Sequence, residues 1–175
     1  KFNFNIVDSK YTIKNSSMSN SVSDALDSDF SDGYINNLVI KDIGGDAIDT
    51  SGSNLKISNL RVSHVIDKAI SAGESSNVSI SQCFLEDIGV GIASKDGSHV
   101  LASECNIKNV ELAALMSYVK KDFYGNPSLN ISSSNFDVDA KFIRQYGTKL
   151  SIDDEYIPYS NLNVDQLYNS TFMKK

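Results

Sequence analysis

The stretch Gly45-Asp46-Ala47-Ile48-Asp49-Thr50-Ser51-Gly52-Ser53 contains a pattern that returns along the chain at a fixed interval. Its centre is the tetrapeptide Asp46-Ala47-Ile48-Asp49, in which a small residue precedes a large apolar one. Related tetrapeptides lie about 22 residues before it and at similar intervals after it. A repeat of this length is typical of a solenoid, in which each repeat packs mainly against its two neighbours. The related tetrapeptides are Asp24-Ala25-Leu26-Asp27, Lys68-Ala69-Ile70-Ser71, Val90-Gly91-Ile92-Ala93 and, after one extra residue, Ala113-Ala114-Leu115-Met116.

Each repeat holds two or three short stretches of alternating apolar and polar residues, separated by Gly, Asn, Ser and Asp, as expected for strands and turns. One such coil cannot bury its own apolar face. Stacking at about 4.8 Å would place Ile48, Ile70 and Ile92 in one interior ladder. We therefore predict an all-β, single-stranded parallel β-helix of about six coils over residues 10–150. A leucine-rich repeat has a similar length, but its Leu-x-x-Leu-x-Leu frame is missing.

The repeat fades near residue 150, which predicts a β-helix over residues 1–152 and a C-terminal cap over residues 153–175. Residues 150–155 are expected to form a hairpin or terminal strand, and residues 163–168 a short closing helix or strand. A cap protects the last strand edge from pairing with other chains. The N-terminal side shows no comparable segment, and the chain begins at Lys1 without Met or signal peptide. We therefore expect that it belongs to a longer protein.

The charge balance argues against two classes of partner. The net charge is −6 and the isoelectric point is near 4.8, whereas binding of nucleic acid needs clustered Lys and Arg. No apolar run approaches the roughly 20 residues that cross a bilayer as a helix. We expect neither a nucleic-acid partner nor a membrane span.

Three phrases of the repeat resemble a known family. They occupy residues 45–53, 67–74 and 91–98. They resemble right-handed parallel β-helix repeats of the pectin-lyase-like superfamily, often described as carbohydrate-binding and sugar-hydrolysis modules, and are similar to β-helix regions of bacterial surface proteins. The resemblance covers residues 34–155 and implies the fold and an extracellular or cell-surface location. It does not fix an activity, because the superfamily includes lyases, hydrolases, epimerases, adhesins and inert scaffolds.

Three functions follow as hypotheses. The favoured one is a carbohydrate-binding or structural module of a secreted or surface bacterial protein, with a polysaccharide or a neighbouring domain of the same chain as partner. The alternative is a Ca²⁺-dependent polysaccharide lyase or epimerase that acts on an acidic glycan. Only Arg61 and Arg144 are available to such an enzyme, and six coils form a short groove. The third is a scaffold that binds a neighbouring domain.

A calcium site is conceivable at Asp46 and Asp49. Stacking would bring Asp24 next to Asp46, and Asp27 next to Asp49, on adjacent coils. Like charges one strand apart repel each other unless a cation or a hydrogen bond compensates. Ca²⁺ prefers carboxylate and carbonyl oxygens of this kind, and β-helix lyases of the superfamily typically hold it between coils. The alternative is that the carboxylates point into water at a turn.

Lys68 and Lys95 are the candidate catalytic bases, with Glu74 and Asp96 as nearby binding carboxylates. A lyase needs a base with a lowered pKa to remove a proton next to the sugar carboxylate. Carboxylates close to these lysines would instead raise the lysine pKa. Structural ion pairs, such as Lys68 with Asp46 on the preceding coil, are therefore the favoured interpretation.

The segment after the fifth coil, residues 118–127, is the largest interruption of the repeat and a candidate binding loop. Loops on rigid scaffolds often carry function. Tyr118 and Tyr124 could stack on a sugar ring, and Lys120 and Lys121 could pair with an acidic glycan. The alternative is an insertion that packs its own aromatic rings against the solenoid.

The small residues of the repeat predict a flat outer track. Each precedes an inward Leu or Ile, so strict alternation would turn it outward. Asp27 and Asp49 would border this track and could contact an extended polymer, or another protein segment could cover it. The small residues are Ala25, Ala47, Ala69, Gly91 and Ala114.

Cys83 and Cys105 are also 22 residues apart and should lie on adjacent coils. Their separation is within disulfide range, but parallel side chains in register would strain the bond. We therefore expect a buried pair of thiols.

Overall fold

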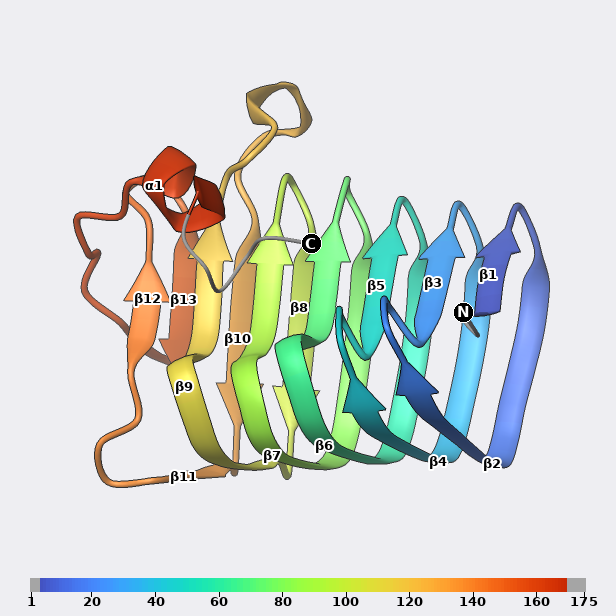
Figure 1. The fold of residues 1–175 in the computed structure, drawn as a ribbon. Coiled ribbons are helices and arrows are strands. Elements are labelled where there is room, and N and C mark those ends of the chain that lie inside the picture. The colour runs from blue at the N-terminus through green and yellow to red at the C-terminus, as the bar shows by residue number, and fades with distance from the viewer. Residues whose placement is uncertain (1–3, 170–175) are drawn as a thin grey trace.

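The computed structural model describes residues 4–169, which stack into a parallel β-helix closed at one end by a hairpin and a short helix (Figure 1). The first strands are β1 (Phe4–Val7), β2 (Lys10–Ser21), β3 (Leu26–Asp29), β4 (Asp32–Ile43), β5 (Ile48–Ser51), β6 (Asn54–Gly73) and β7 (Asn77–Lys95). They are followed by β8 (His99–Ser103), β9 (Asn106–Tyr118), the 3₁₀ helix η1 (Asp122–Tyr124), β10 (Ser128–Ser132), β11 (Asn135–Phe136), β12 (Phe142–Arg144), β13 (Lys149–Ile152), β14 (Glu155–Tyr156) and α1 (Val164–Asn169).

The predicted interior ladder is confirmed. Ile48 pairs in register with Ile70, and Ile70 with Ile92, through parallel bridges between β5, β6 and β7. The described residues form about seven turns with a spacing of about 22 residues, against about six predicted. The difference arises at the N-terminal end, where β1 continues the same ladder by pairing Phe4 with Leu26.

The chain turns its corners at residues in the left-handed backbone region. Asn15, Asn37 and Asn59 have φ angles of 48°, 55° and 51°. Asn tolerates this region better than most residues. The Asn37 side chain also donates a hydrogen bond of 2.8 Å to Asn15 one turn away. A polar residue at this spacing therefore marks where one flat sheet ends and the next begins.

A second polar ladder lies inside the solenoid. The hydroxyl of Ser53 accepts a hydrogen bond from the backbone N–H of Ser31 at 2.9 Å, and Ser76 does the same for Ser53 at 3.1 Å. Ser98 continues the series by accepting from Ser76. All four serines are buried. These bonds satisfy backbone donors at a corner where the regular strand ladder is interrupted.

The flat outer track of small residues was a wrong prediction. Ala25, Ala47, Ala69 and Ala114 are buried in the main hydrophobic core. The strands β3 and β5 begin only at Leu26 and Ile48, so strict alternation does not extend to the alanine before them. There is little room for a side chain at these positions, because a Cβ on Gly91 would lie 2.2 Å from the backbone carbonyl oxygen of Ala114.

The C-terminal end is closed by a different kind of structure. β13 pairs parallel with β10 and antiparallel with β14, so the parallel stack ends in a hairpin. The helix α1 folds back along the solenoid, where Leu167 packs against Val90, Ala93 and Met116. The predicted cap, residues 153–175, therefore includes β14 and α1. Its last residues, 170–175, and residues 1–3 of the predicted β-helix lie outside the described residues.

The expectation of free thiols was also wrong, because Cys83 and Cys105 form a disulfide with a Cα separation of 4.4 Å. Cys105 lies in the corner between β8 and β9, outside the regular strand ladder. Two side chains in register on paired strands point the same way and would strain a disulfide, but this restriction does not apply to a residue in a corner.

We expect Ile70→Ala to lower the free energy of unfolding by about 3–4 kcal/mol, because the change leaves a cavity in the interior ladder. The matched control is Ile66→Ala in the same strand β6. Ile70 is fully buried, whereas Ile66 is 66% exposed. Urea unfolding followed by circular dichroism measures both variants. Equal destabilisation by the two changes would contradict the assigned register.

Reduction of the Cys83–Cys105 disulfide should lower the free energy of unfolding by about 3 kcal/mol, because the bond closes a segment of 22 residues. Urea unfolding with and without reductant tests this. The double variant with Cys83→Ser and Cys105→Ser should match the reduced chain and should not respond to reductant. Free thiols in the unfolded, unreduced chain would show that the bond does not form.

Candidate functional site

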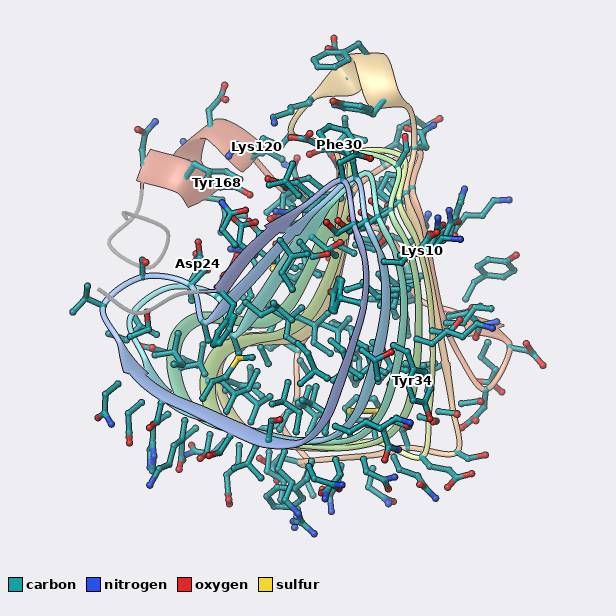
Figure 2. All side chains as sticks on the ribbon, turned by 90° about the vertical axis from the view of Figure 1, so that its right-hand side faces the viewer. Lys10, Asp24, Phe30, Tyr34, Lys120 and Tyr168 are labelled. Atoms are coloured by element: carbon teal, nitrogen blue, oxygen red, sulfur yellow. A yellow bond between two sulfur atoms is a disulfide. The ribbon has the colours of Figure 1, made fainter. Side chains whose placement is uncertain are left out.

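Two outer faces of the solenoid carry candidate site residues, and they meet at the edge where Phe30 lies (Figure 2). The first face is formed by β3, β5 and the C-terminal parts of β6, β7 and β9, and α1 and the loop of residues 119–127 lie next to it. We call it the acid–lysine face. Asp24, Lys120 and Tyr168 lie on this side in Figure 2, and Lys10 and Tyr34 lie on the other.

Lys68 is buried between two carboxylates. Its Nζ lies 2.6 Å from Asp67 Oδ1 and 3.3 Å from Asp46 Oδ1, and its side chain is only 2% exposed. Asp46 Oδ1 also accepts the backbone N–H of Lys68 at 3.0 Å. The cross-turn pairing of Lys68 with Asp46 therefore follows the 22-residue register.

The protonation of this group follows from its burial. Burial raises the pKa of Asp46 to about 6, although Lys68 opposes the shift. Burial acts to lower the pKa of Lys68, but the carboxylates of Asp46 and Asp67 outweigh it and raise that pKa above its usual value. Lys68 is therefore an ammonium ion out of contact with solvent. The prediction that it serves a substrate as a general base is not supported by this geometry.

Lys95 is the second candidate base, and it is also paired. Its Nζ lies 3.9 Å from Asp49 Oδ1. The side chain crosses the outer face over Gly73, where an added Cβ would lie 3.5 Å from the Lys95 Cε. Lys95 is therefore placed to form an ion pair across the face rather than to present a free amine to a substrate.

The residues do not favour the predicted calcium site. Within residues 4–169, no group of three or more His, Cys, Asp or Glu side chains is arranged to hold a metal ion. Asp46 forms an ion pair with Lys68, and Asp49 forms one with Lys95. The repulsion between stacked carboxylates, which suggested Ca²⁺, is instead compensated by ammonium groups and backbone N–H donors. Asp24 Oδ1, for example, accepts the backbone N–H of Asp46 at 2.7 Å.

Further acidic residues lie on the acid–lysine face, near the N-terminal end of the solenoid. Asp27 pairs in register with Asp49 between β3 and β5, as predicted. Burial raises the pKa of the neighbouring Asp29, and the charges of Asp49 and Glu74 add to the shift. Asp29 therefore lies close enough to Asp49 and Glu74 to be affected by their charges.

The loop of residues 119–127 is bound to the solenoid by the residues that were predicted to bind glycan. Asp96 Oδ1 accepts the backbone N–H groups of Lys120 and Lys121 at 2.6 and 2.7 Å. Glu74 forms an ion pair with Lys121 and accepts a hydrogen bond of 3.2 Å from Tyr124. Glu74 and Asp96 thus fix the position of the loop.

Tyr118 does not lie on the loop surface. It is fully buried, and its hydroxyl is 2.8 Å from that of Tyr168 in α1. Lys120 lies over the Tyr168 ring, with 4.0 Å between its Nζ and the ring centroid. Burial, followed by repulsion from Lys95 and Lys121, lowers the pKa of Lys120. Stacking of a sugar on Tyr118 was therefore a wrong prediction, because α1 occupies that position.

The other face contains a groove of about 650 Å³ that sequence reasoning missed. Its floor is the outer surface of β4, β6, β7, β8 and β10, and Asp154 of the terminal hairpin reaches its edge. One line of floor residues runs in register across five turns. These residues are Tyr34, Lys56, Ser79, Leu101 and Asn130.

A second line of groove residues consists of serines. Ser58, Ser81, Ser103 and Ser132 pair in register on consecutive turns. All four line the groove, which we therefore call the serine groove. The spacing of the serines is visible in the sequence, but serine is so common in this chain that the line could not be recognised there.

The serine groove has apolar as well as polar surface. Tyr34 is 41% exposed and Leu101 is 60% exposed. An adjoining depression of about 460 Å³ extends the same face toward Lys10 and Asn54. Lys14 lies 5.5 Å from the Tyr34 ring centroid and supports the ring from one side. The groove therefore combines apolar contact surface with hydroxyl and amide groups.

Comparison with known proteins agrees with this architecture. A family described as "Right handed beta helix region" matches residues 4–154, which is most of the chain. The chain belongs to this right-handed β-helix family. No curated protein and no solved structure gives a match. Membership of the right-handed β-helix family sets the fold and its handedness but not an activity.

The right-handed β-helix has little helical structure. Among the residues described, no helix has the length and apolar character needed to span a membrane.

Proposed function

We propose that this right-handed β-helix is a non-catalytic carbohydrate-binding module that holds an extended glycan in the serine groove. The observation that carries the proposal is the register of the floor residues. Tyr34, Lys56, Ser79, Leu101 and Asn130 occupy one line across five consecutive turns. A ligand that follows this line contacts one side chain from every turn.

The dimensions of the groove suit a linear polymer. Turns are stacked at about 4.8 Å, so five of them extend over roughly 20 Å. The groove is open to solvent along its length, so an extended chain can lie in it. A polysaccharide in an extended conformation meets these requirements, whereas a compact small molecule would leave most of the line uncontacted.

The chemistry of the groove also suits a sugar. A sugar ring has an apolar face that packs on an aromatic ring such as Tyr34, or on an aliphatic side chain such as Leu101. Its hydroxyl groups both donate and accept hydrogen bonds, as do serine hydroxyls and the Asn130 amide. A few polar groups placed around apolar surface are typical of ligand-binding sites.

A secreted or cell-surface location is part of the proposal. The Cys83–Cys105 disulfide supports it, because disulfides persist mainly in oxidising compartments. The lyase or epimerase alternative has less support, since Lys68 and Lys95 are both engaged by carboxylates. A purely structural module is the other outcome that the following experiment can give.

We expect the labelled chain to bind at least one member of an array of neutral and acidic plant and bacterial polysaccharides. For the best ligand, Tyr34→Ala should weaken binding about tenfold, or about 1.4 kcal/mol, because a stacking surface is lost. Leu101→Ala should weaken it as well. Affinity electrophoresis in gels that contain the polysaccharide measures the dissociation constants.

Phe123→Ala is the matched control. Phe123 is an exposed aromatic residue on the loop beside the acid–lysine face, away from the groove. Its removal should leave the affinity unchanged. Unchanged affinity in both groove variants would place the glycan elsewhere, and an array without any bound polysaccharide would leave a structural role.

A further inference from the structure

The buried group of Lys68, Asp46 and Asp67 has a geometry that goes beyond an ion pair. One amine lies between two carboxylates at 2.6 and 3.3 Å, and all three side chains are at most 7% exposed. Burying a lysine and two aspartates is costly, because each charge loses its hydration. The group also joins two adjacent turns, since Asp46 precedes β5 and Lys68 lies on β6, 22 residues later.

We propose that Lys68 and Asp46 condense to an intramolecular amide (isopeptide) bond that links these two turns, with Asp67 as the proton acceptor. The reaction needs no cofactor and releases one water molecule. This modification is independent of glycan binding, since none of its three residues lines the serine groove.

The first step is transfer of a proton from the Lys68 ammonium to the Asp67 carboxylate, which lies 2.6 Å from Nζ. This step creates the neutral amine that can act as a nucleophile. In the surrounding low dielectric, exchange of an ion pair for two neutral groups removes the cost of keeping the charges buried. Asp67 is therefore the catalytic residue of the proposed reaction.

The second step is attack of the Lys68 amine on the Cγ of Asp46. The acid form of Asp46 is the better electrophile, and burial favours that form by raising its pKa to about 6. The backbone N–H of Lys68 donates to Asp46 Oδ1 at 3.0 Å and can stabilise negative charge that develops on this oxygen. The bond from Cγ to the other oxygen breaks.

The atoms and charges balance. The Asp46 hydroxyl leaves with one proton from the amine as water, the amide keeps the last amine proton, and Asp67 retains the proton that it accepted. An ammonium, a carboxylate and a carboxylic acid thus become an amide, a carboxylic acid and water. Two polar groups remain in the protein, the amide and the Asp67 carboxylic acid, and neither is charged. The three residues are almost completely buried, and this dry environment favours release of water and protects the amide from hydrolysis.

Intact mass spectrometry of the reduced, denatured full chain tests the proposal. The isopeptide bond lowers the mass by about 18 Da relative to the sequence, because one water is lost. Proteolysis should yield one linked peptide pair that contains Asp46 and Lys68. Lys68→Arg and Asp67→Asn should keep the full sequence mass. Asp46→Asn should lose about 17 Da instead, because an amide acceptor releases ammonia.

Lys95→Arg is the matched control, because it removes the second lysine of the same face, whose Nζ lies 3.9 Å from its carboxylate partner. This variant should still lose one water. A wild-type chain that keeps the full sequence mass after prolonged incubation between about pH 5 and pH 8 would overturn the proposal, whatever the variants show. Loss of water in Lys68→Arg would also overturn it, because the dehydration would then lie elsewhere.

Discussion

Parallel hydrogen bonding between successive turns is the constraint on which the rest of the structure depends. Each turn consists of short strands that cannot bury their apolar side chains alone. Parallel pairing of β5 with β6 and of β6 with β7 places Ile48, Ile70 and Ile92 above one another. The same register places outward residues in lines, so the serine groove is composed of residues from several consecutive turns.

The register explains what could be predicted from the sequence. The interior ladder, the pairing of Asp27 with Asp49 and the cross-turn contact of Lys68 with Asp46 all follow from a spacing of about 22 residues. The predictions that failed concern places where the register does not decide the outcome. Ala25 and Ala47 lie in a corner just before a strand, Ala69 follows a register shift within β6, and Cys105 lies in another corner. Tyr118 is covered by α1, a segment outside the repeat.

The serine groove escaped prediction for a different reason. A search for repeats finds positions at which similar residues recur. The groove floor combines Tyr34, Lys56, Ser79, Leu101 and Asn130, which share no chemical property, although they lie in one line. A line of different residues presents a different group to each part of a bound ligand. The regular positions therefore reveal the fold, whereas the irregular ones carry the candidate function.

The disulfide also determines how this solenoid would respond to a pulling force. Strands torn from the end of a parallel stack release their turns one after another, and each residue adds at most about 3.6 Å of length. The covalent bond between Cys83 and Cys105 withholds one complete turn from this process, because the segment between them cannot be extended. The disulfide thus shortens the maximum extension of the pulled chain by roughly 70–80 Å. Tension applied at the two ends would pass from Cys83 to Cys105 through the disulfide, and the residues between them would carry none of it.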